Sequence, residues 1–148
     1  MIYEVELPLP PRILSSNARA HPMVRHRAHM AYKGDCVCVI RQGFGLFWDA
    51  AKCLYFPRGV ILHYDFYMGP SDWKRRTGSD DFARPRDVDR ALSCVTGVQD
   101  ALVDACLIPD DSAKWVSIGT VRLLRKQAEH GGRCCLMLRI ESRGEERE

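Results

Sequence analysis

Four aspartates flank an apolar, helix-length segment in the second half of the sequence. Asp87 and Asp89 lie two residues apart in the arginine-rich run 84–90, and Asp110 and Asp111 form a second pair beyond the segment. If these carboxylates gather at one point, they offer the oxygen ligands that a hard divalent cation such as Mg²⁺ prefers. A cation with arginines around it suits a phosphate substrate, because it activates water and neutralises phosphate charge. We therefore hypothesise a magnesium-dependent phosphodiesterase that acts on nucleic acid.

Ordinary structural roles offer another explanation of these aspartates. Asp87 or Asp89 would serve as the N-cap of the following helix, because aspartate accepts hydrogen bonds from free N–H groups at a helix start. Pro109-Asp110 is a common turn pair. One cap needs only one aspartate, however, and two neighbouring carboxylates repel each other unless a cation or an arginine lies between them. A structural or interaction domain without DNA activity stays open as an alternative.

Basic residues concentrate in two other stretches of the chain. From Leu7 to Gly34 there are five Arg or Lys and three His but no Asp or Glu, and the polar loop expected at 69–86 is cationic. The formal net charge of +3 is too small to indicate a polyanionic partner by itself. A solvated loop with Trp73 and Phe82 packed on the core explains 69–86 equally well. The basic residues expected to contact DNA are Lys74, Arg75, Arg76, Arg84, Arg86, Arg90, Arg19 and Arg25.

Three histidines in the first basic stretch raise the question of a metal site. His26 and His29 would share one face of a helix, and His21 precedes them. No carboxylate or cysteine between Leu7 and Gly34 is present to complete a ligand set. We therefore interpret the three histidines as part of a solvated basic face or as phosphate contacts.

The seven cysteines are odd in number and show no Cys-x-x-Cys spacing. We interpret them as small buried hydrophobic residues in a reducing cytoplasm. A zinc site is the alternative. The neighbouring Cys134 and Cys135 would point to opposite faces of a strand, which makes shared ligation of one ion difficult.

The composition of the chain is that of one soluble domain. Its 148 residues are 46% hydrophobic and 28% charged, which allows a real core and argues against disorder. The first residues lack the pattern of a secretory signal, and no apolar run reaches the roughly 18 residues of a membrane span. We expect one domain over 1–148 in the cytoplasm, without a membrane partner, and with 141–148 as a flexible charged tail.

The periodicity of apolar residues predicts the elements that must position the aspartates. Alternation predicts strands at 2–7, 60–68, 116–124 and 133–140, and helical spacing predicts helices at 22–40 and 87–105, with a further helical piece at 46–55. Strand 60–68 is apolar on both sides and is predicted to be central and covered on both faces. Strands 116–124 and 133–140 are predicted to pair as an antiparallel hairpin. The fold class is α/β (α+β), a single mixed sheet with helices packed on it in the order β-α-β-α-β-β.

Four segments of the sequence resemble the RusA family of Holliday junction resolvases, particularly its phage and prophage members. They are the proline-rich turn Leu7-Pro-Leu-Pro-Pro11, the segment Leu14-Ser-Ser-Asn-Ala-Arg-Ala-His21, the motif Arg86-Asp-Val-Asp89, and the run Asp100-Ala-Leu-Val-Asp-Ala-Cys-Leu-Ile-Pro-Asp-Asp111. The last two have the spacing of the family, and the similarity covers most of the chain except 34–56.

The resemblance implies a structure-selective endodeoxyribonuclease that acts in DNA recombination and repair within a bacterial host cell. The enzyme would be a homodimer that cuts symmetric strands of a four-way DNA junction with Mg²⁺ or Mn²⁺. Carried over by position, the catalytic residues are Asp87, Asp89 and Asp111, and Asp110 joins them as a metal ligand.

The sequence departs from the family pattern at three positions. Arg90-Ala91 follow Asp89 where the family usually has Asn-Leu, Thr96 stands where the family usually has a supporting lysine, and Cys106 replaces a glycine at the helix end. Without the lysine, the site lacks a point charge that could stabilise the transition state. Arg90 and Lys114 are candidates to replace it. A branched-DNA-binding protein of the same fold with weak or no catalysis is therefore the alternative function.

Overall fold

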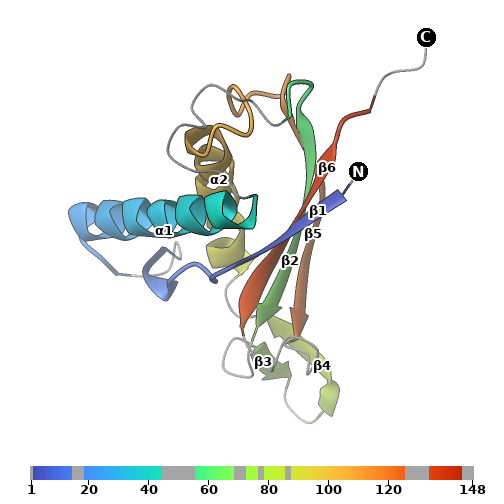
Figure 1. The fold of residues 1–148 in the computed structure, drawn as a ribbon. Coiled ribbons are helices and arrows are strands. Elements are labelled where there is room, and N and C mark those ends of the chain that lie inside the picture. The colour runs from blue at the N-terminus through green and yellow to red at the C-terminus, as the bar shows by residue number, and fades with distance from the viewer. Residues whose placement is uncertain are drawn as a thin grey trace.

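A four-stranded mixed sheet carries two helices on one of its faces (Figure 1). The computed structural model describes residues 2–14, 19–44, 56–68, 73–76, 79–85, 88–125 and 134–144. Within those ranges, it does not describe the side chains of residues 12, 73–76, 79–85, 88–90, 92, 93 and 125. The helical piece expected at 46–55 lies outside the described residues. The mixed sheet with packed helices confirms the expected fold class at this level.

The sheet has the strand order β1-β6-β2-β5. Its strands are β1 (Ile2–Leu7), β6 (Cys135–Ser142), β2 (Val60–Met68) and β5 (Val116–Arg125). β2 has a strand on each side, antiparallel β6 and parallel β5, which confirms the central position predicted for 60–68. β6 continues to Ser142 and therefore includes the first two residues of the segment expected to be a flexible tail.

The antiparallel hairpin expected between the last two strands is wrong. β6 lies between β1 and β2, and β5 pairs with β2 alone. In the central position, β6 buries Leu136, Leu138 and Ile140 completely beneath the helices, which an edge position would not do. The connection from β5 has to pass only one strand, a distance of about 10 Å or two strand spacings. The short segment between β5 and β6 is therefore long enough to join them without the two strands being neighbours in the sheet.

The two helices, α1 (Pro22–Gly43) and α2 (Val88–Asp104), cover only one face of the sheet (Figure 1). On that face β2 buries a complete row of side chains with no exposed surface: Val60, Leu62, Tyr64, Phe66 and Met68. The second face of β2, predicted to be covered as well, is buried only in part: Ile61 and His63 are partly exposed. On the other face, Asp65 and Tyr67 are buried among the side chains of the neighbouring strands.

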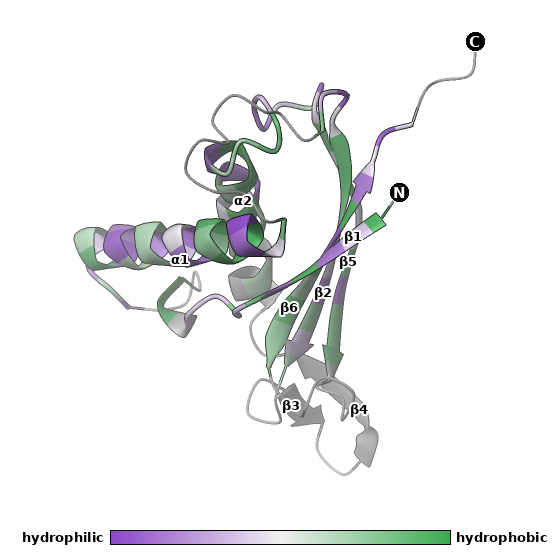
Figure 2. Cartoon of the chain, viewed as in Figure 1, coloured by the Kyte–Doolittle hydropathy of each residue, from purple (hydrophilic) through white to green (hydrophobic). Residues whose placement is uncertain are grey.

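α1 packs on the sheet mainly through its C-terminal half. Tyr32, Cys36 and Ile40 are buried at four-residue spacing, and the Tyr32 hydroxyl donates a hydrogen bond to the Pro8 carbonyl at 2.8 Å. Polar and apolar segments alternate along the rest of the helix (Figure 2). Val24 is 46% exposed, because the N-terminal half of α1 extends beyond the edge of the sheet (Figure 1).

The segment expected to be a polar loop at 69–86 contains two strands. β3 (Trp73–Arg76) and β4 (Ser79–Pro85) pair with each other as an antiparallel, two-stranded sheet. The predictions of a single sheet and of a polar loop at 69–86 are therefore corrected. This hairpin lies at the end of the main sheet opposite the chain termini (Figure 1).

The cysteines divide into buried and exposed groups. Cys36, Cys94 and Cys135 are buried, whereas Cys38 and Cys134 are exposed, so the interpretation of every cysteine as a buried hydrophobic residue is wrong. Burial raises the pKa of the Cys36 thiol to about 11, which keeps this thiol protonated and unreactive.

α2 ends in a left-handed turn at Cys106. The backbone N–H of Leu107 donates to the Leu102 carbonyl at 3.1 Å, and the N–H of Cys106 donates to the Val103 carbonyl at 2.9 Å. These two bonds define a Schellman motif, in which glycine is the preferred residue at the left-handed position. Cys106 adopts that conformation with a φ of 62°. Cys106 therefore occupies a backbone conformation that glycine adopts at lower cost.

Cys106→Gly should stabilise the protein by about 1 kcal/mol, because glycine adopts positive φ without the steric cost of a Cβ atom. Urea denaturation measures the change. Cys106→Ala is the matched control, since it removes the thiol but keeps the Cβ atom. Equal stability of the two variants would show that the backbone conformation at this position carries no cost.

Asp65 is the only buried polar or charged residue within the described ranges. Both of its carboxylate oxygens accept hydrogen bonds at 2.7 Å from the Arg122 guanidinium on β5. The Arg139 guanidinium on β6 lies 3.6 Å away. The hydrogen bonds from Arg122 are the main cause that lowers the pKa of Asp65. Asp65, Arg122 and Arg139 together link β2, β5 and β6 on the face of the sheet opposite α1 and α2.

Asp65→Asn should destabilise the protein by about 2 kcal/mol at neutral pH, the usual loss for hydrogen bonds to a charged group. Since the folded-state pKa of Asp65 is lowered, its contribution is complete above the unfolded pKa of about 4 and is lost as the pH falls. Urea denaturation at neutral and acidic pH should therefore show a difference between wild type and variant that shrinks in acid. Asp35→Asn, at an exposed site on α1, is the control. A difference that grows in acid would contradict this assignment.

Candidate functional site

Asp89 and the pair Asp110 and Asp111 lie at opposite ends of α2. Asp89 belongs to the first turn of the helix, and Asp110 and Asp111 follow its C-terminus. A helix of 17 residues spans about 25 Å. Asp87 is outside the described residues, and the side chain of Asp89 is not described. In the part of the chain that the structure does describe, no three His, Cys, Asp or Glu side chains are grouped to hold a metal ion.

The chain beyond α2 is fixed at the start of β2, far from the first turn of the helix. The N–H of Phe56 donates to the Leu107 carbonyl at 3.0 Å, and the N–H of Val60 donates to the Trp115 carbonyl at 2.7 Å. Arg143 also holds this segment, since its guanidinium donates to the Lys114 carbonyl at 2.5 Å. Within one chain, the length of α2 therefore separates the backbone of Asp89 from Asp110 and Asp111.

Asp110 has a local structural role. Its Oδ1 atom accepts a hydrogen bond from the backbone N–H of Ser112 at 2.5 Å, and this bond is the main cause that lowers the pKa of Asp110. The geometry is that of a turn stabilised by an aspartate side chain. Asp111 is exposed beside it. Lys114, a candidate for the missing lysine, lies in the same segment with its Nζ 5.0 Å from the centre of the Trp115 ring.

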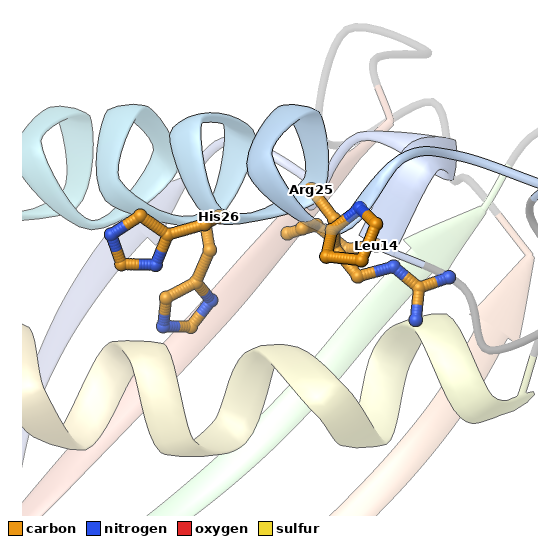
Figure 3. A pocket seen from close by; sticks show the side chains of 5 residues that line it. Leu14, Arg25 and His26 are labelled. Carbon is orange, nitrogen blue, oxygen red and sulfur yellow. The ribbon is translucent and has the colours of Figure 1, made fainter.

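α1 supplies side chains along α2, from the last residue of that helix to its middle. Lys33 pairs with Asp104 at 3.1 Å, and His29 lies over Gly97, where an added Cβ atom would be 3.1 Å from the imidazole. Moving back along α1 from Lys33 to His29, the contacts move back along α2 from Asp104 to Gly97. Arg25 precedes His29 by about one turn of α1 and therefore lies closer to the start of α2 than His29 does. Arg25 and His26 extend from α1 toward α2 (Figure 3).

These side chains line a pocket of about 380 Å³. The described residues that line it are Leu14, Pro22, Arg25, His26 and His29. Leu14 ends the short helix η1 (Arg12–Leu14), which packs against both α1 and α2. None of these five residues carries a negative charge. The pocket is therefore basic on the α1 side and apolar where η1 and Pro22 border it.

His21 is the N-cap of α1. Its Nδ1 atom accepts a hydrogen bond from the backbone N–H of Met23 at 3.1 Å, and Pro22 occupies the first helical position. The capping role was missed from the sequence, because histidine is not among the usual capping residues. The signal available there was Pro22, which marks a helix start.

The remaining predicted site residues are placed mainly by their backbone. Lys74, Arg75 and Arg76 belong to β3, Arg84 to β4 and Arg90 to the first turn of α2, and Arg86 lies outside the described residues. Arg19 is exposed and precedes α1. Thr96, at the position of the family lysine, is exposed on α2. The structure thus places the backbone of Arg90 beside that of Asp89 and leaves Thr96 at the surface.

No protein-family model matches this chain, and no curated protein matches it. Among the helices that the structure describes, none is both long and apolar enough to cross a membrane.

Proposed function

We propose that the protein is a metal-dependent endonuclease that recognises branched DNA, with its reactive centre at the N-terminal turn of α2. One observation supports this proposal: His29 packs over Gly97 in the middle of α2, and Arg25 and His26, which precede it on α1, extend toward α2 (Figure 3). Carboxylates for a cation and basic groups for phosphate would then meet at one place.

The proposal assigns a separate task to each group of residues. A bound Mg²⁺ or Mn²⁺ would activate a water molecule and neutralise charge on the scissile phosphate. Asp87 and Asp89 would hold the cation, and Arg90 in the same turn would neutralise an adjacent phosphate. The basic residues of the β3–β4 hairpin, which precedes α2 directly, would contact the DNA backbone on either side of the cut.

A homodimer is part of the proposal. A two-fold dimer presents two equivalent centres, which fits a four-way junction with two equivalent strands. Its expected signature is a pair of symmetric nicks, and light scattering should give twice the mass of one chain.

A second function is favoured by the separation of the two acidic pairs. Asp110 is engaged in its own turn, and Asp111 lies at the far end of α2 from Asp89. Without these ligands and without the family lysine, the fold would bind branched DNA and cut it slowly or not at all.

The two functions differ in a direct assay with the purified protein. A synthetic four-way junction is incubated in Mg²⁺ and then in Mn²⁺, with a linear duplex of the same sequence as control. The proposal expects paired nicks in the junction and none in the duplex. Tight, salt-sensitive binding to the junction without nicking would support the binding protein instead. No preference for the junction over the duplex would contradict both.

A further inference from the structure

The pocket between α1 and η1 has the features of an anion site. Arg25, His26 and His29 converge on it from successive turns of one helix face. Its volume of about 380 Å³ lies within the range of about 300–1,000 Å³ that is usual for small-ligand sites. Guanidinium and imidazolium groups form charge-assisted hydrogen bonds with phosphate oxygens.

The donor set favours an anion over a metal ion. A metal bound by His26 and His29 would need further ligands, and the described lining offers only an arginine and two apolar side chains. His21, the remaining histidine near the pocket, uses its Nδ1 atom to cap α1. Within the pocket, the positive charge of the Arg25 guanidinium favours a phosphate over a cation.

The position of His29 depends on Gly97. An added Cβ atom at Gly97 would lie 3.1 Å from the imidazole Cε1, closer than ordinary packing allows. The absence of a side chain at Gly97 therefore lets the Cε1 corner of the His29 ring approach α2 closely, and His29 also lines the pocket. His29 is half-buried, whereas His26 is exposed.

We propose that Arg25, His26 and His29 form a binding site for a phosphate of a nucleic-acid strand, with Leu14 and Pro22 packed against the attached sugar. The further statement that this strand is the one about to be cut rests on the proposed function. The binding step itself requires neither a divalent cation nor cleavage. It can therefore be measured even if the protein is not a nuclease.

The test is NMR of the histidine imidazole signals in the full chain without divalent cations. One titration uses inorganic phosphate, and a second uses a short single-stranded oligonucleotide. His63 is an internal control, because its ring lies on the opposite face of the sheet and bonds to Thr120 and Glu141 at 3.1 Å. We expect saturable shifts of His26 and His29 in both titrations and no shift of His63.

Variants test whether the shifts report binding in the pocket. Combined His26→Gln and His29→Gln should weaken oligonucleotide binding about tenfold, the loss of one or two charge-assisted contacts. His26→Gln alone, at an exposed site, should weaken it a few-fold without disturbing the packing on α2. Arg27→Gln removes a charge from an exposed position of the same helix that does not line the pocket. It should change the affinity by less than about twofold.

Three results would overturn the inference. The first is an equal shift of His63, which would indicate a general salt effect. The second is an unchanged oligonucleotide affinity in the double variant. The third is a shift of His26 and His29 with inorganic phosphate but not with the oligonucleotide. That result would make the pocket a site for free phosphate and not for a nucleic-acid strand. If the wild-type protein binds the oligonucleotide at this site but does not cleave the four-way junction, the proposed function is contradicted and the phosphate site still stands.

Discussion

Asp87→Asn and Asp89→Asn should each lower Mg²⁺-dependent nicking of a four-way junction by about a thousandfold, equivalent to about 4 kcal/mol of transition-state stabilisation. The physical reason is that a neutral amide replaces a negatively charged ligand of the cation at the start of α2. Gel assays of the nicked strands under single-turnover conditions measure the effect. Junction binding in Ca²⁺ should persist, because these residues do not supply the basic contacts to the DNA backbone.

Asp110→Asn and Asp111→Asn are the comparison variants. They lie beyond the far end of α2, about 25 Å from its first turn, so we expect a much smaller loss of nicking from either. Full nicking by Asp87→Asn and Asp89→Asn would contradict a metal site at the N-terminus of α2. An equal loss from Asp111→Asn would mean that two chains contribute to one centre.

Gly59→Ala should destabilise the protein by about 3 kcal/mol or more, from a left-handed backbone and a steric overlap together. Gly59 has a φ of +90°, and an added Cβ atom would lie 2.9 Å from the Trp115 Cα atom. The carbonyl of Trp115 accepts a hydrogen bond from the backbone N–H of Val60, and this bond lies where the pairing of β2 with β5 begins. The substitution would therefore disturb the central strand at its first residue.

Urea denaturation of Gly59→Ala and Gly34→Ala separates this local effect from a general effect of glycine replacement. Gly34 lies within α1, and an added Cβ atom there would meet no atom within 4 Å. Gly34→Ala should therefore stabilise the protein by up to about 1 kcal/mol through helix propensity. A loss of similar size in both variants would show that the contact with Trp115 is not the cause.

Periodicity predicted the elements whose burial is one-sided. β1 alternates between core and solvent along its length, and α2 buries Ala91, Val95, Val98 and Leu102 as its spacing predicts. Both patterns result from local geometry, which a sequence records directly. Gly97, which interrupts the apolar pattern of α2, lies against His29 of α1.

Strand order and the arrangement of the aspartates depended on contacts between distant parts of the chain. The position of β6 between β1 and β2 results from matching apolar rows on three strands, and sequence distance gives no information about it. Four aspartates near one helix were expected to meet, but the length of α2 separates the pairs. Asp65 was missed as a buried charge, because its partners Arg122 and Arg139 come from strands far along the chain.

Broadening of NMR signals by Mn²⁺ tests the central claim most directly, since a paramagnetic ion broadens the signals of nearby protons. The claim is that a divalent cation binds at the N-terminal turn of α2, beside the pocket on α1. We predict that Mn²⁺ broadens the imidazole signals of His26 and His29, spares His63, and loses this effect in Asp87→Asn and Asp89→Asn. Broadening confined to the Trp115 indole, beside Asp110 and Asp111, would place the cation at the wrong end of α2 and contradict the claim.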